Sequence, residues 1–235
     1  MSKNARRFTR RNKSRSEQNF QRKHSPELRA QTPRQKEYID ALKRDDLVFC
    51  VGYAGTGKTY ISATSAAKFY QERVINKIVI TRPNISSGKG LGYFPGTLEE
   101  KMSPWVSPII EVLTKHLGKA SVEIMMKHGD IVIEPFETLR GKSFENSFVL
   151  LDEAQNCTYH ELKMFLTRLG NGSKTVINGD VMQTDLAQNS GLRKIINLIK
   201  QQMLPFPIIE FQEEDIVRSD LCAVWIRAFN KYERK

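Results

Sequence analysis

The stretch GYAGTGKT, Gly52–Thr59, decides the fold expected of this chain. It fits the pattern GxxxxGK[ST], in which glycines let successive backbone N–H groups of a loop turn inward onto an anion. The apolar run Leu47–Val51 precedes the loop, and a helical pattern follows it as far as Tyr70. A strand, a glycine-rich loop and a helix in this order favour a phosphate-binding loop (the P-loop, or Walker A motif) over a chance glycine-rich turn.

The residues of the P-loop have expected roles in binding a nucleotide. Lys58 is expected to reach the β- and γ-phosphates of ATP, and the hydroxyl of Thr59 to bind Mg²⁺. The dipole of the helix that begins here adds to the attraction for phosphate. We therefore expect ATP and Mg²⁺ as cofactors, with the nucleotide held by Gly52, Tyr53, Ala54, Gly55, Thr56, Gly57, Lys58, Thr59 and Tyr60.

Short apolar runs separated by helical patterns continue along the chain. Short runs that are apolar throughout, with helices between them, predict a mostly parallel sheet with helices on both faces. With the P-loop, this pattern indicates a single α/β domain of the RecA-like P-loop NTPase class. The further strands are expected at Lys77–Thr81, Ile131–Ile133, Phe148–Leu151, Thr175–Ile177 and Ile208–Phe211.

An acidic pair, Asp152 and Glu153, directly follows the predicted strand Phe148–Leu151. A carboxylate at a strand end beside a P-loop can hold Mg²⁺, directly or through water, which is the role expected of Asp152. Glu153 is then placed to orient or deprotonate the attacking water. Such a pair could instead cap a helix N-terminus, but the P-loop upstream favours the metal and base roles.

A third polar element, NGDVMQ at Asn178–Gln183, follows the next predicted strand. An amide at this position can hydrogen-bond the γ-phosphate or the water, which makes Gln183 a candidate catalytic residue. Asn-Gly-Asp is also strong turn chemistry, so a plain turn is the alternative.

The segment Pro83–Pro108 is rich in glycine and proline and is expected to form a long loop. Its aromatic residues Tyr93, Phe94 and Trp105 lie near lysines, among them Lys89. Bases stack on aromatic side chains while cations follow the phosphate backbone, so this composition suits a single-stranded nucleic acid.

Positive charge is concentrated at the N-terminus. The chain has a formal net charge of +11, and residues 1–24 hold nine Lys and Arg but a single acid, Glu17. With few large apolar residues, this segment is expected to be disordered. We therefore divide the chain into a basic arm, residues 1–28, and an ATPase domain, residues 29–235. The arm suits a phosphate backbone, and the alternatives are a solubilising tail or an address signal.

Cysteine usage and hydropathy indicate a compartment. Cys50, Cys157 and Cys222 are odd in number and form no CxxC pair, which favours a reducing compartment over a disulfide or zinc framework. The sequence holds no apolar run near the roughly 20 residues that span a bilayer, and no secretory signal at its N-terminus. The expected location is the cytoplasm, without a membrane partner.

The P-loop, the motif DEAQ (Asp152–Gln155) and the motif GDxxQ (Gly179–Gln183) together resemble the nucleotide-binding half of superfamily 1 helicases. A closer resemblance is to the PhoH family of ATPases, and it covers roughly residues 30–232. The stretches that carry it are TRPNISSGKGLGYFPGTLEEKMSPW (Thr81–Trp105), LRGKSF (Leu139–Phe144), VLLDEAQNCTYHELKMFLTRLGNGSKTVINGDVMQTDL (Val149–Leu186) and EEDIVRSDL (Glu213–Leu221).

The resemblance implies roles for residues outside the three motifs. Gln35 resembles the glutamine that reads the adenine edge, and the alternative is an exposed helix residue. Arg218 matches an arginine of the family's C-terminal helix. This arginine acts either in trans, as an arginine finger on a neighbour's ATP, or in a surface salt bridge. Arg168 is the substitute candidate for the finger. The sequence departs from the family at three positions. Asn178 and Ser219 replace residues that are more usual in the family, and Lys142 stands where arginine is common.

The length of the chain bears on its assembly. A superfamily 1 helicase has two RecA-like lobes with ATP between them, whereas about 205 residues follow the basic arm, enough for one lobe. The second wall of the site is then expected from another subunit, in a homo-oligomeric ring with a head-to-tail interface. The family resemblance implies the same, as a hexamer.

Two functions are consistent with these motifs. The first is a PhoH-like ATPase that hydrolyses ATP with Mg²⁺ while acting on RNA or single-stranded nucleic acid, as in helicase-like remodelling. The alternative is an ATP-dependent switch that acts on a protein partner without a nucleic-acid substrate. A small-molecule kinase is disfavoured, because DEAQ followed by GDxxQ is typical of a site that positions water.

Overall fold

A computed structural model describes residues 27–83, 98–180 and 190–233 of the chain. Nearly all of the predicted basic arm lies outside these residues, as do Gln183 and the aromatic pair Tyr93 and Phe94. None of the helices within the described ranges has the length and apolar character needed to cross a membrane.

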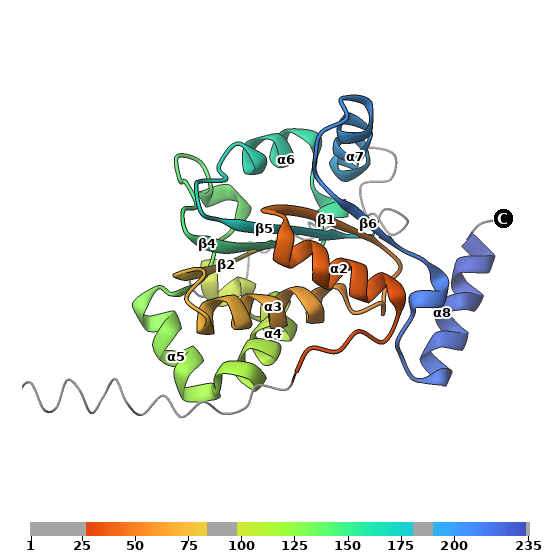
Figure 1. The fold of residues 1–235 in the computed structure, drawn as a ribbon, viewed down its shortest axis with the longest axis horizontal. Helices are drawn as coiled ribbons and strands as arrows, with labels where there is room; N and C mark the ends of the chain where they lie inside the picture. The colour runs from red at the N-terminus through yellow and green to blue at the C-terminus, as the bar shows by residue number, and fades with distance from the viewer. Residues whose placement is uncertain (1–26, 84–97, 181–189, 234–235) are drawn as a thin grey trace, which may run out of the picture.

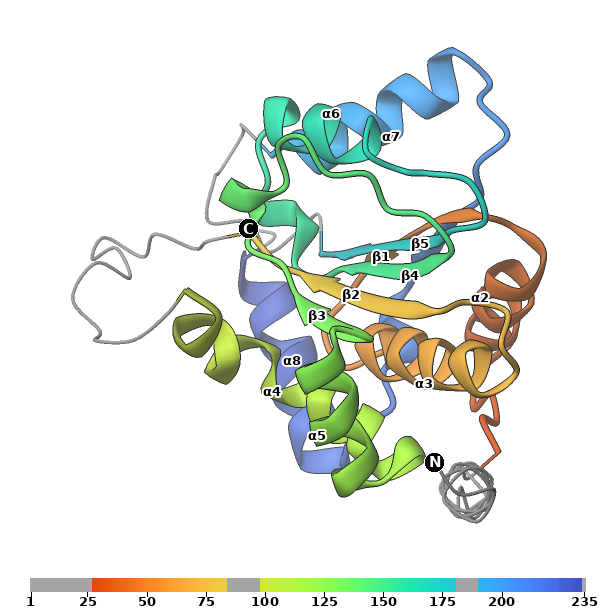
Figure 2. The same cartoon turned by 90° about the vertical axis from the view of Figure 1, so that its left-hand side faces the viewer.

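Six strands form one parallel sheet in the order β3-β2-β4-β5-β1-β6 (Figures 1 and 2). Every recorded strand pairing is parallel, so the carboxyl ends of the strands lie at one edge of the sheet. The predicted single α/β domain is confirmed. The strands are β1 (Leu47–Gly52), β2 (Lys77–Thr81), β3 (Ile131–Ile133), β4 (Ser147–Leu151), β5 (Lys174–Gly179) and β6 (Ile208–Phe211).

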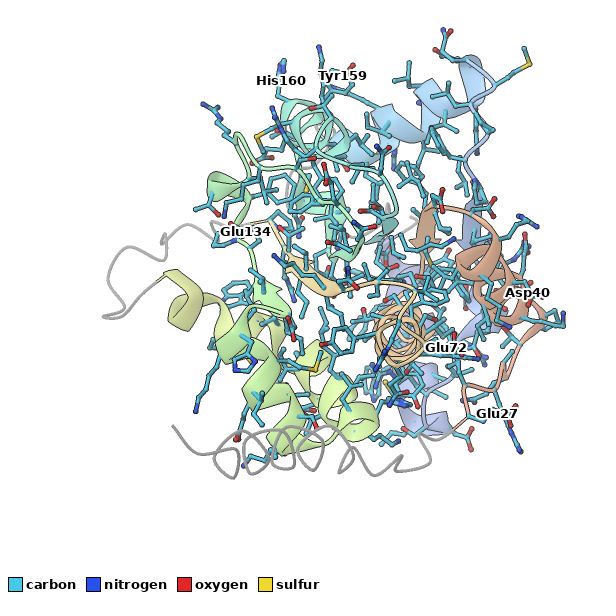
Figure 3. All side chains as sticks on the ribbon, turned by 60° about the vertical axis from the view of Figure 1, so that its left-hand side comes forward. Glu27, Asp40, Glu72, Glu134, Tyr159 and His160 are labelled. Carbon is cyan, nitrogen blue, oxygen red and sulfur yellow. The ribbon has the colours of Figure 1, made fainter. Side chains whose placement is uncertain are left out.

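Helices cover both faces of the sheet, as Figure 2 shows. Tyr159 and His160 lie at the outer surface of one helical layer, and Asp40 and Glu72 lie in the opposite layer (Figure 3). One layer contains α2 (Pro33–Arg44), α3 (Lys58–Gln71), α4 (Leu98–Leu117) and α5 (Lys119–His128); the other contains α6 (Tyr159–Leu166) and α7 (Gly191–Gln201); α8 (Asp220–Glu233) follows β6.

The strands are apolar throughout because both of their faces are buried. Successive side chains of a strand point to opposite faces of the sheet. In β4, Phe148 and Leu150 belong to the core beneath α3 and α4, whereas Val149 and Leu151 belong to the core beneath α6 and α7. All four side chains are almost fully buried. The continuous apolar runs therefore reflect two separate cores rather than one.

The predicted long loop is wrong in its second half. The glycines and prolines predicted a loop as far as Pro108, but α4 begins at Leu98 and contains both Pro104 and Pro108. Proline removes a helical hydrogen bond and crowds the preceding turn. Here burial outweighs that penalty, because Ile109 and Leu113, four residues apart on one helix face, are almost fully buried in the core.

A buried polar network joins α2, α3 and β5. The Tyr38 hydroxyl donates to Asn178 Oδ1 at 2.9 Å, and Asn178 Nδ2 donates to Ser62 Oγ at 3.0 Å. All three residues are buried. A buried amide is tolerated when its hydrogen-bonding groups are paired, so this network explains how an asparagine is accommodated at position 178. It also fixes the end of β5 against the P-loop helix.

Candidate nucleotide site

A cavity of about 540 Å³ lies at the carboxyl edge of the sheet. The P-loop follows β1, the acidic pair follows β4, and Gly179 and Asp180 lie at the end of β5, so parallel pairing brings the three sequence motifs together. Ligands of open α/β sheets bind at this edge. The lining includes Gln35, Ala54, Gly55, Gly57, Lys58, Thr59, Tyr60, Asp152, Glu153, Gly179, Asp180 and Arg218.

The backbone of the P-loop requires glycine at its start. Gly52 has φ +121°, and a Cβ at this position would lie 2.1 Å from the carbonyl oxygen of Phe211. Any larger residue would therefore break the pairing between β1 and β6. At the other end of the loop, Gly57 has φ +89°, and α3 begins at the next residue. The first residues of α3, Lys58, Thr59 and Tyr60, line the cavity, and the N-terminus of a helix favours an anion.

The Lys58 side chain folds over the P-loop. Its Nζ donates to the carbonyl oxygens of Gly52 and Tyr53, both at 2.7 Å. These neutral acceptors hold the ammonium at the mouth of the loop. Charge-assisted hydrogen bonds to phosphate are stronger than bonds to neutral carbonyls, so a phosphate group in the loop would compete effectively for this ammonium.

Thr59 and Asp152 come together although 93 residues separate them in the sequence. The Thr59 hydroxyl donates to Asp152 Oδ1 at 3.1 Å. A hydroxyl and a carboxylate are oxygen donors of the kind that Mg²⁺ prefers, and Mg²⁺ usually takes one or two protein ligands beside phosphates and waters. This pair therefore fits the predicted metal site.

Asp152 is a perturbed acid. Burial raises its pKa to about 6, and the nearby Glu153 carboxylate adds to the rise. The positive charges of Arg82 and Lys58 act in the opposite direction. A bound divalent cation favours the ionised form, so metal binding near neutral pH or below should release a proton from Asp152.

Glu153 stands in an unusual backbone conformation. Its φ of +57° lies in the left-handed region, at the start of the short 3-10 helix Ala154–Asn156. Among the described residues its side chain makes no capping hydrogen bond to that helix, which disfavours the capping role. The carboxylate instead accepts a hydrogen bond from Gln155 at Oε2 and lies 3.6 Å from Arg82 at Oε1.

Gln155 links the end of β4 to the end of β5. Its Nε2 donates to Glu153, and its Oε1 accepts from the backbone N–H of Asp180 at 3.0 Å. The segment that begins at residue 181, with Gln183, lies outside the described residues, so the predicted role of Gln183 stays a prediction. Gln155 therefore connects Glu153 to Asp180, the last described residue before that segment.

Gln35 lines the cavity and contacts the P-loop, and it does not lie on an exposed helix surface. It is 3% exposed, its Nε2 donates to the Thr56 carbonyl at 2.9 Å, and its Oε1 accepts from Gln31 N–H at 2.8 Å. The alternative of an exposed helix residue is therefore wrong. In this arrangement the amide supports the P-loop, and its reading of adenine stays a prediction.

Arg218 lies in the cavity of its own chain. A Cβ at Gly55 would lie 2.9 Å from Arg218 Cγ, and Val217 N–H donates to the Gly55 carbonyl at 3.0 Å. This position differs from that expected of an arginine that acts only on a neighbouring subunit. Arg168, in contrast, is not among the cavity residues.

Two residues that contact Glu153 beside this site were missed in the sequence. Arg82 follows β2 directly, and Gln155 is the last residue of the DEAQ motif. Both stand at the same edge as the predicted acids, and the signal that could have found them is their position just after buried strands. Their long polar side chains reach Glu153 from both sides.

The parallel sheet, the P-loop between β1 and α3, and the acid at the end of β4 define a P-loop NTPase domain. The chain matches the family model described as "PhoH-like protein" over residues 27–230. It therefore belongs to the PhoH-like protein family.

Curated relatives have similar sequences. The PhoH-like protein of Bacillus subtilis is 43% identical over 87% of this chain and 64% of its own length. The PhoH-like protein of Mycobacterium tuberculosis H37Rv is 38% identical, over 88% of this chain and 59% of its own length. The protein PhoH of Escherichia coli K12 is 38% identical, over 86% of this chain and 58% of its own length. The chain thus spans about three fifths of these relatives.

Among solved structures, the Pif1 helicase from Candida albicans matches with a TM-score of 0.39 and 14% identity. The match covers 78% of this chain and 40% of the helicase.

Replacing Asp152 by asparagine should stabilise the metal-free protein in a pH-dependent way. Because the folded-state pKa of Asp152 is raised from 3.8 to about 6, ionising it costs folding stability. That cost is small at pH 4, grows as the pH rises through 6, and is constant above about pH 7. Asp152→Asn should therefore gain up to about 3 kcal/mol at pH 7.5 but only about 0.5 kcal/mol at pH 4, measured by urea unfolding in EDTA.

The control is Asp46→Asn, because the Asp46 side chain is 84% exposed. Its effect should stay within about 0.5 kcal/mol at every pH. A gain for Asp152→Asn that is equal at pH 4 and pH 7.5 would contradict the assignment of Asp152 as the group responsible.

Proposed function

We propose that this chain binds ATP with Mg²⁺ and hydrolyses it. The observation that carries the proposal is the convergence of Lys58, Thr59, Asp152 and Glu153 in one cavity. A cationic side chain, a hydroxyl–carboxylate pair and a second carboxylate are the groups that hydrolysis of a nucleoside triphosphate requires.

Each of these groups has a distinct part in the proposed reaction. Lys58 and the N–H groups of the P-loop bind the β- and γ-phosphates, and Thr59 with Asp152 holds Mg²⁺. A bound metal ion would neutralise charge on the phosphate oxygens. Glu153 orients a water molecule and accepts its proton as the water attacks the γ-phosphorus, while the bond from the γ-phosphorus to the β–γ bridging oxygen breaks and ADP leaves. The 3.6 Å separation from Arg82 leaves Oε1 of Glu153 able to accept that proton.

Glu153→Gln should separate binding from hydrolysis. The amide keeps the shape of the side chain but cannot accept the proton, so ATP affinity should stay within about twofold while kcat falls at least about 100-fold. Affinity is measured with a non-hydrolysable ATP analogue and kcat by phosphate release. Lys58→Ala is the comparison variant, because loss of the ammonium should abolish ATP binding itself. Wild-type turnover by Glu153→Gln would show that the base lies elsewhere.

We propose further that Arg218 acts on the nucleotide of its own chain. Its contact with Gly55 places a cation beside the P-loop, where it would stabilise charge developing on the phosphates. The homo-oligomeric ring, a hexamer by family resemblance, stays part of the proposal because the described residues form one lobe. Arg168 lies outside its own cavity and is the candidate to complete a neighbouring site in that ring.

Mixing variants distinguishes the two arginines. Lys58→Ala subunits mixed with Arg168→Ala subunits should regain ATPase activity, because some interfaces then pair an intact P-loop with an intact arginine. Lys58→Ala mixed with Arg218→Ala should regain none, since every chain carries a defect in its own site. Recovery in the Arg218 mixture would restore the trans role. A monomer by light scattering with full activity at every dilution would remove the ring.

RNA or single-stranded nucleic acid is the proposed substrate class, supported by the charge of residues 1–24. The proposed location is the cytoplasm, supported by three free cysteines. Neutralised phosphates release counterions, so an arm that contacts them makes binding depend steeply on salt.

Deleting residues 1–24 should weaken RNA binding and flatten the dependence of log K on log salt, while basal ATPase activity stays unchanged. Binding is measured by fluorescence anisotropy at several salt concentrations. An unchanged slope would reduce the arm to a solubilising tail. An ATPase rate that neither RNA nor DNA alters would favour the switch that acts on a protein partner.

A further inference from the structure

Arg82 occupies a fixed place beside the acidic pair. It follows Thr81, the last residue of β2, and Thr81 is paired in register with Leu151 of β4. The backbone N–H of Asp152 donates to the Thr81 carbonyl at 3.1 Å, which extends the pairing beyond the strand. The residue before Arg82 is therefore fixed beside the acidic pair by the pairing of the sheet.

The guanidinium of Arg82 bridges α4 and the acidic pair. Its Nη1 donates to the carbonyl oxygen of Trp105 at 2.9 Å, and its Cζ lies 5.5 Å from the centre of the Trp105 ring. Its Nη2 lies 3.6 Å from Oε1 of Glu153. The Arg82 side chain is only 17% exposed. Its Nε is buried without a hydrogen-bond partner among the described residues.

A largely buried guanidinium needs an anion, because arginine stays charged in proteins and an unpaired buried charge is costly. In the described part of the chain, the recorded ion pair of Arg82 is with Glu153, and the positive charge also lowers the pKa of Asp152. The hydrogen bond and the ring contact with Trp105 anchor the guanidinium beside Glu153.

The distance between Arg82 and Glu153 decides what the pair can do. At 3.6 Å it is an ion pair rather than a hydrogen bond, whose N···O distances are 2.7–3.2 Å. The attraction can therefore orient the carboxylate without occupying the lone pairs of Oε1. Gln155 holds the other oxygen, Oε2, by a hydrogen bond. Together the two side chains fix the direction of the Glu153 carboxylate while leaving one oxygen able to accept a proton.

We propose that Arg82 is the positioning residue of the catalytic base: anchored by Trp105, it holds Glu153 in the direction needed to orient water. This inference rests on the proposed ATP hydrolysis. Arg82 is not among the residues that line the cavity, so it acts through Glu153 rather than on the nucleotide. A base that loses its orientation costs rate rather than binding.

The test is a double-mutant cycle on kcat in the full chain. Arg82→Ala should lower kcat at least about 10-fold, with affinity for a non-hydrolysable ATP analogue within about twofold. In a Glu153→Gln background, Arg82→Ala should change the single-turnover rate by less than about twofold, because groups that act as a unit are not additive. Arg82→Lys should retain part of kcat, since an ammonium keeps the charge but lacks the fork that reaches both partners.

The matched control is Arg44→Ala, which removes a guanidinium whose side chain is 71% exposed and should leave kcat unchanged. Losses that multiply in the double variant, an increase in kcat for Arg82→Ala, or an affinity loss as large as the kcat loss would each overturn the proposal. If Arg82→Ala does not fold, the same cycle with Arg82→Lys decides, since full kcat for Arg82→Lys would also overturn it.

The two proposals fail differently. If Glu153→Gln itself turns over at the wild-type rate, the proposed role of Glu153 fails and the positioning role fails with it. If Glu153→Gln is slow but Arg82→Ala has wild-type kcat, the proposed function stands and only the positioning role fails.

Discussion

Parallel pairing of the central strands is the constraint on which the rest of the structure depends. In the register of β1, β5 and β4, Val51 lies opposite Gly179, and Leu151 lies opposite Ile177. The three strands therefore end within about two residues of one another. The P-loop, the acidic pair and the end of β5 meet because of this alignment, and a shift of register would separate the groups of the cavity.

The sequence predicted the parts of the molecule whose signals are local. The apolar strands, the P-loop and the acid that follows β4 each depend on neighbouring residues, and parallel topology then required them to meet. Lys58, Thr59 and Asp152 therefore lie where the spacing placed them. The family resemblance named Gln35 and Arg218 as residues of the site. It did not show which groups these two side chains contact.

What the sequence did not predict depends on tertiary contacts. Pro104 and Pro108 read as loop residues, and only burial of the opposite face of α4 makes that segment a helix. The places of Gln35 and Arg218 depend on how α2 and the segment after β6 fold back onto the P-loop. The spacing of residues along the chain does not show where a distant segment packs against the P-loop. The position of Arg82 directly after a strand was a local signal, but its contacts with Trp105 and Glu153 depend on the fold and not on spacing.

The burial of α3 has a mechanical consequence. Its residues Ile61 to Ala67 are all buried, and several of them are small, among them Ala63 and Ala66. Small side chains allow close approach, so the helix is enclosed between the sheet and α4 and has little room to shift or rotate. The proposed phosphate site therefore rests on a helix that is anchored in the core. The helix α8 is the opposite case, because its Trp225 and Phe229 are largely exposed and so leave it less tightly enclosed than α3.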